Sequence, residues 1–136
     1  MNYVFVFNLG CECQTVFILL KNGPLLRQWT IQGVYQRYGK IDGKPTWISE
    51  KTNRAIWYTA PGMDWAIGDI GIIGTTYSNI AGFGDQGKLS CPYNAPNDTW
   101  KYSNNGRGWV VAGVNDVNIQ CLTGESTFVI SSNCQF

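Results

Sequence analysis

The sequence predicts an all-β fold: a disulfide-stabilised antiparallel sandwich or barrel with strand-like N- and C-terminal extensions. Short apolar or β-branched runs recur along the 136 residues, and turn residues separate them at close spacing. No window repeats apolar residues at i, i+3, i+4 and i+7, so any helix should be short. The five cysteines, none of them in a CxxC pair, favour disulfide bonds over a structural zinc site.

The first predicted strand, residues 2–7, alternates three aromatic residues, Tyr3, Phe5 and Phe7, with two valines. An apolar strand at a chain end needs a partner, either in its own sheet or in that of a neighbouring copy. These aromatic residues therefore define a candidate assembly strand, and whether it pairs within the chain or between chains stays open. Further strands are expected at residues 15–20, 28–31, 33–38, 46–49, 55–59, 64–67, 99–102, 109–112, 116–121 and 126–130.

Turns are predicted where residues tolerate a positive φ or fix its value. The best hairpin signal is Asp42-Gly43, between two β-like runs. The glycine-rich segment 68–90 predicts a strand or two embedded in long loops. Turns are also expected at Asn22-Gly23-Pro24, Pro61-Gly62 and Asn105-Gly106.

The chain is expected to hold one β module with an extension at each end. Residues 1–12 are the N-terminal extension strand, and residues 13–121 are the module itself. Residues 122–136 form a C-terminal tail that contains the strand-like run 127–130. No charge run or proline-rich linker divides the module further.

The composition is poor in charge and excludes several functions. Ten basic and nine acidic residues give a net charge of +1, and histidine is absent. Without histidine there is no Ser-His-Asp triad, no Cys-His pair and no His-ligated zinc site. The scattered basic residues form no footprint for a nucleic-acid backbone, and no apolar run approaches the ~18 residues that cross a bilayer. We therefore expect no nucleic-acid partner and no membrane span.

The acidic residues show no catalytic motif. Glycoside hydrolysis needs two carboxylates about 5–10 Å apart, which almost any pair in a compact domain could satisfy, and aspartate also suits turns. The segment Asn115-Asp116-x-Asn118 lacks the spacing of a calcium-binding loop. We predict a chain that is not an enzyme, with no catalytic residue, metal or cofactor.

The cysteines are candidates for disulfide bonds. Cys13 and Cys121 lie at the ends of the module's first and last strands, so a bond between them would join those strands. Cys11 and Cys134 lie in the extensions and are expected to pair with each other or with their copies in the next subunit. Cys91 is the fifth candidate, and an odd count leaves one thiol over.

The sequon Asn97-Asp98-Thr99 predicts N-glycosylation at Asn97 in an extracellular setting.

The six tryptophans allow two interpretations. Most are expected to fill the core, because a small all-β domain needs large apolar side chains. The alternative is a platform on which sugar rings stack. Its best candidates are Trp100, Tyr102, Asn104 and Trp109, which combine aromatic faces with amides of a loop.

The aromatic residues also form a spaced signature with glycines and cysteines. In chain order it reads Gly33-Val34-Tyr35, Gly39, Gly43-Lys44-Pro45, Trp47, Trp57-Tyr58, Trp65-Ala66-Ile67-Gly68, Tyr77, Cys91-Pro92, Trp100, Trp109, Val117-Asn118-Ile119 and Cys121. This pattern resembles a little-characterised module of secreted proteins from aquatic invertebrates and protists, and it covers residues 13–121. The resemblance implies a secreted, non-enzymatic, repeat-forming module with no established ligand. The chain departs from it in its two extensions and in the extra cysteine beside Cys13.

Two functions are consistent with these observations. The first is a non-enzymatic extracellular structural module that self-assembles into a filament, tube or matrix through terminal-strand exchange and disulfides. Its partners would be copies of itself. The alternative is a lectin-like module that binds carbohydrate through surface Trp and Tyr side chains.

Overall fold

The computed structural model describes residues 4–8, 11–59, 64–82, 91–94, 100–123 and 127–131. The strands are β1 (Val4–Asn8), β2 (Thr15–Leu20), β3 (Gly33–Ile41), β4 (Lys44–Ser49), β5 (Arg54–Thr59), β6 (Asp64–Asp69), β7 (Ile80–Gly82), β8 (Trp100–Ser103), β9 (Trp109–Val111), β10 (Val117–Thr123) and β11 (Thr127–Ser131). The helical segments are α1 (Asn22–Arg27) and the 3₁₀ turns η1 (Trp29–Ile31), η2 (Ile70–Ile72) and η3 (Pro92–Asn94).

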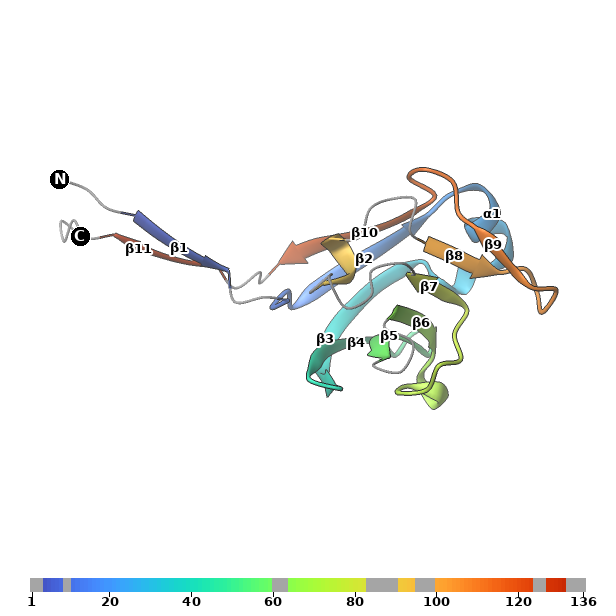
Figure 1. Ribbon diagram of the computed structural model, residues 1–136, viewed down its shortest axis with the longest axis horizontal. Helices are drawn as coiled ribbons and strands as arrows, with labels where there is room; N and C mark the ends of the chain where they lie inside the picture. Colours follow the sequence, from blue (N-terminus) through green and yellow to red (C-terminus); the bar gives the residue numbers. More distant parts are fainter. Residues whose placement is uncertain are drawn as a thin grey trace.

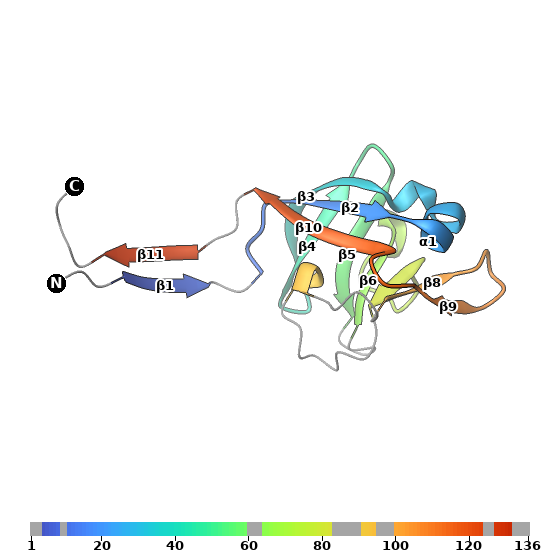
Figure 2. The ribbon, with the colours of Figure 1, turned by 90° about the horizontal axis from the view of Figure 1, so that it is seen from above.

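These strands form one large curled sheet and one small ribbon. The large sheet has nine antiparallel strands in the order β10-β2-β3-β4-β5-β6-β7-β8-β9, and the ribbon pairs β1 with β11. Figure 2 shows the large sheet curling around its own interior as a half-barrel. Within the described ranges, β9 and β10 end the sheet and do not pair with each other. The all-β antiparallel prediction is confirmed.

The turn chemistry explains the two clearest hairpins. Asp42 and Gly43 have φ values of 51° and 78°, and Asn105 and Gly106 have 50° and 81°. Positive φ at both central residues is what a type I′ turn requires, and this turn matches the twist of the flanking strands. Both predicted turns are confirmed, whereas Pro61-Gly62 lies outside the described residues.

The prediction of a strand at residues 28–31 is wrong. The chain turns helically here, because Pro24 sits early in α1, where its missing N–H costs no hydrogen bond. The Gln28 N–H donates to the carbonyl of Pro24, and the Ile31 N–H donates to that of Gln28. These helical turns place Ile31 in the core, where its side chain is fully buried. The expectation that any helix is short is confirmed, since α1 has six residues.

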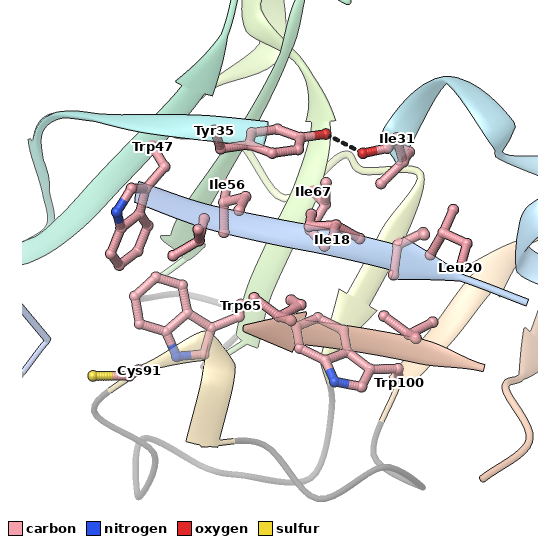
Figure 3. Close-up of a cluster of buried hydrophobic side chains, with 14 of the residues drawn as sticks. Ile18, Leu20, Ile31, Tyr35, Trp47, Ile56, Trp65, Ile67, Cys91 and Trp100 are labelled. Atoms are coloured by element: carbon pink, nitrogen blue, oxygen red, sulfur yellow. Dashed lines mark hydrogen bonds between the residues drawn. The ribbon is translucent and has the colours of Figure 1, made fainter. Parts of the chain in front are cut away.

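The inner face of the curled sheet holds a core built largely from aromatic side chains. Burial alternates along β2, as expected for a strand with one face inward. Figure 3 shows Trp47, Trp65 and Trp100 gathered with isoleucines around β2. The ring centroids of Trp47 and Trp65 lie 6.1 Å apart, within the range of favourable aromatic pairs. Trp47, Trp65 and Trp100 thus fill the core, as the first interpretation predicted, whereas Trp29 and Trp109 are exposed.

A second, smaller cluster covers part of the outer face of the sheet. It packs Trp57, Ala55 and Ala66 against isoleucines of β4 and of the segment around η2. The indole N–H of Trp57 donates to the carbonyl of Thr75 at 3.0 Å, which fastens that segment to the sheet. Because both faces are covered here, nearly every residue of β5 and β6 is buried.

Two disulfides join distant parts of the chain. Cys13 bonds to Cys121 with a Cα–Cα distance of 5.8 Å, which confirms the predicted link between β2 and β10. Cys11 bonds to Cys91 with a Cα–Cα distance of 5.1 Å. The prediction that Cys11 pairs with Cys134 is therefore wrong. The fold brings η3 against β10, next to Cys11, and this approach is not encoded by sequence spacing.

Candidate functional site

The terminal strands β1 and β11 form a two-stranded ribbon separate from the large sheet. Antiparallel register runs from Val4 opposite Ser131 to Asn8 opposite Thr127. Both Figure 1 and Figure 2 show this ribbon extending to one side of the curled sheet. No third strand joins the ribbon within the described part of the chain. Both of its edges therefore present backbone N–H and C=O groups.

The two strands of the ribbon, VFVFN and TFVIS, contain no charged residue. The register places Phe5 opposite Ile130 and Phe7 opposite Phe128, so these four positions belong to one face. Val6 opposite Val129 belongs to the other face. The sequence thus places three phenylalanines and an isoleucine at positions of one face, and valines with polar residues at positions of the other. An isolated two-stranded ribbon is marginally stable in water.

Several bonds hold the residues around the start of β2 and the end of β10 on the main sheet. The Cys13–Cys121 bond ties the residues before β2 to β10. The indole N–H of Trp47 donates to the carbonyl of Cys13 at 2.7 Å. The Arg37 guanidinium donates to the carbonyl of Cys11 at 3.1 Å and lies 3.5 Å from the Glu12 carboxylate.

The candidate assembly residues fall partly in this ribbon. Phe5 and Phe7 belong to β1, where they face β11 of the same chain in the register. Tyr3, Cys134 and the glycosylation candidate Asn97 lie outside the described residues. The sequence had left open whether the strand pairs within or between chains, and here it pairs within one chain.

The structure does not bring the four candidate glycan-binding residues to one surface. Trp100 is 1% exposed and belongs to the core, whereas Trp109 is 47% exposed. Tyr102 lies opposite Val110, so it shares the inner face with Trp100 and not the outer face of Trp109. The backbone N–H of Asn104 closes the β8–β9 turn on the carbonyl of Gly108. Of the proposed stacking platform, Trp109 alone keeps an exposed aromatic face.

Described residues line hollows on the outer surface. A groove of about 770 Å³ runs between β3 and the residues that follow β4, beside the exposed Tyr38. Two amide oxygens of its lining already accept hydrogen bonds: that of Gln32 from the Leu20 N–H, and that of Gln36 from the Thr15 hydroxyl. The second hollow, of about 130 Å³, adjoins Trp109. Sequence reasoning missed its other members because they come from distant strands.

Among the described residues, no group of three or more His, Cys, Asp or Glu side chains could hold a metal ion. None of the helices described above is long and apolar enough to span a membrane.

The fold and its bonds define the class of this chain as an all-β protein built on one curled antiparallel sheet with two disulfides. In comparisons with protein-family models, curated proteins and solved structures, nothing matches it. The resemblance to the secreted invertebrate and protist module stays a prediction from the spaced aromatic residues.

Proposed function

We propose that this chain is a non-enzymatic extracellular structural module that self-assembles through its terminal strands. The observation that carries the proposal is the β1–β11 ribbon, which has two open edges and apolar residues on both faces. A strand added from another copy satisfies the edge N–H and C=O groups by main-chain hydrogen bonds. Packing against that copy also removes the apolar faces from water.

The same geometry favours an open assembly over a closed dimer. The main sheet ends at β9, whose Val110 and Val111 are exposed, so it offers a second apolar edge. A ribbon that pairs with the sheet edge of the next copy makes a head-to-tail contact. Contacts of this kind propagate into filaments or tubes unless the rotation between copies closes a ring.

An oxidising environment is consistent with this assembly. Disulfides such as Cys11–Cys91 and Cys13–Cys121 persist mainly in extracellular and secretory compartments. These bonds use four of the five cysteines of the sequence, and Cys134 is the fifth. A bond between copies at Cys134 would then link subunits covalently.

A charge placed on each face of the ribbon tests the proposal. In the Val6→Lys/Phe7→Lys variant, each ammonium resists burial against another copy. We expect the wild-type chain to show a weight-average mass that rises with concentration in sedimentation velocity, and the variant to stay monomeric. Leu26→Lys is the matched control, because Leu26 is an exposed apolar residue on α1, away from the ribbon. A variant that assembles like the wild type, or a monomeric wild type, would contradict the proposal.

A further inference from the structure

The hollow beside Trp109 lies on the outer face of the large sheet and is lined by residues from five of its strands, β5 to β9. The register places Thr59 opposite Asp64 and Ala81 opposite Lys101. Thr76 and Ser78, from the segment between η2 and β7, complete its rim. The hollow therefore gathers residues that are up to fifty positions apart in the sequence, as Thr59 and Trp109 are.

The hollow exists because two alanines adjoin each other in the sheet. Ala66 lies opposite Ala81, and both are nearly fully buried beneath the surface. On the other side of Ala66, the register places Trp57, whose bulk fills the outer face there. Beyond Ala81, the edge strand β9 contributes Trp109 to the same hollow. The short side chains of Ala66 and Ala81 therefore form the bottom of the hollow, between Trp57 and Trp109.

The rim combines an aromatic face with both signs of charge and with hydroxyl groups. Asp64 supplies a carboxylate, which accepts hydrogen bonds, and Lys101 supplies an ammonium, which donates them. The Lys101 Nζ lies 5.3 Å from the centroid of the Trp109 ring, so the ammonium and the indole are held together. Thr76 and Ser78 can both donate and accept.

We propose that this hollow binds one neutral sugar ring, as a free monosaccharide or as the terminal residue of a glycan. A pyranose has an apolar C–H face that can stack on the Trp109 indole. Its hydroxyl groups can both donate hydrogen bonds to, and accept them from, the polar side chains of the rim. One carboxylate and one ammonium leave the hollow without a net charge, which favours a neutral ligand. Its volume of about 130 Å³ is below the ~300 Å³ where drug-sized ligand pockets begin, so it takes one ring and not a chain.

The tryptophans provide a direct readout. Trp47, Trp57, Trp65 and Trp100 are at most 1% exposed, so Trp29 and Trp109 are the two whose fluorescence responds to a surface ligand. The experiment titrates the full chain carrying Trp29→Phe with the methyl glycosides of galactose, glucose, mannose and N-acetylglucosamine. We expect a saturable change in Trp109 emission with at least one glycoside in the millimolar range.

Variants locate the binding by saturation-transfer NMR, which needs no tryptophan signal. Trp109→Ala and Asp64→Asn should each weaken binding at least tenfold, and thermal melting checks that both variants fold. Trp29→Ala is the matched control, since it removes an exposed tryptophan outside the hollow and should change affinity less than twofold. No binding by any glycoside would overturn the proposal. Binding that survives both hollow variants and is lost in Tyr38→Ala would also overturn it, because it would place the site in the β3 groove.

Discussion

At the scale of single residues, Tyr35 shows how the core satisfies a buried polar group. Its side chain is fully buried, and its hydroxyl donates to the carbonyl of Ile31 at 2.5 Å (Figure 3). Burial raises the pKa of this phenol far above its usual range, although the nearby Arg54 guanidinium acts in the opposite direction. The phenol therefore stays neutral in the folded chain, and the bond fastens η1 to β3.

Removing this hydroxyl should destabilise the fold. In Tyr35→Phe the Ile31 carbonyl is left buried without its donor, which costs about 1–3 kcal/mol in the free energy of unfolding. Urea denaturation measures the loss, and Tyr38→Phe, at an exposed tyrosine, should change it by less than about 0.5 kcal/mol.

The same variant tests the pKa. Because the pKa of Tyr35 is raised in the folded chain, its contribution to stability is complete below about pH 10, the pKa of an unfolded tyrosine, and declines above it. The wild type should therefore lose more stability than Tyr35→Phe between about pH 9 and pH 11. Parallel pH profiles for the two proteins would contradict the burial of a neutral phenol.

At the scale of secondary structure elements, the disulfides join the residues before β2 to β10 and to the start of η3. β10 follows β9 in sequence but pairs with β2, the first strand of the sheet. The Cys13–Cys121 bond fixes that pairing. The Cys11–Cys91 bond fixes η3 nearby. Both bonds therefore stabilise the main sheet on the side of β2 and β10.

Loss of either bond should cost similar stability. The bonded residues are 108 positions apart in Cys13–Cys121 and 80 apart in Cys11–Cys91. A disulfide reduces the conformational entropy of the unfolded chain, and this effect grows only with the logarithm of the length of the closed loop. Each double alanine variant should therefore lose about 2–4 kcal/mol in the free energy of unfolding, and the two losses should agree within about 0.5 kcal/mol. Guanidinium denaturation of the two variants measures this. A Cys13→Ala/Cys121→Ala variant as stable as the wild type would show that the bond does not stabilise the main sheet.

At the scale of the whole molecule, the low charge and the exposed apolar strands act together. A net charge of +1 gives copies little electrostatic repulsion, and the ribbon strands contain no charged residue. The proposed assembly is therefore apolar and backbone-mediated, in contrast to one held by ion pairs.

Salt should have little effect on that assembly. Raising the ionic strength from about 0.05 M to about 0.5 M shortens the Debye length and weakens exposed ion pairs, but it leaves apolar contacts and strand pairing in place. We expect the weight-average mass in light scattering to change less than about twofold over this range. An assembly that dissociates at high salt would point to charged contacts outside the ribbon.

Local sequence signals predicted the strands and turns well, and their failures have physical causes. Asp42-Gly43 and Asn105-Gly106 were predictable because positive φ is a property of those residues themselves. Residues 28–31 were mistaken for a strand because Gln28, Trp29 and Ile31 suit a strand, while hydrogen bonds back to Pro24 and Gln28 select a helical path. Within the candidate site, the strands at residues 2–7 and 126–130 were both predictable from their apolar runs, but their pairing with each other was not.

The sequence by itself determined the alternating strands, the turn positions, the tryptophan-rich core and the Cys13–Cys121 bond. Only the tertiary structure decided that Cys11 bonds to Cys91, that Trp100 points inward and Trp109 outward, and that two alanines open a hollow beside Trp109. The reason is physical. Backbone preference and burial period act over a few neighbouring residues, whereas strand order and register join residues far apart in the chain, and a shift of one position exchanges the faces.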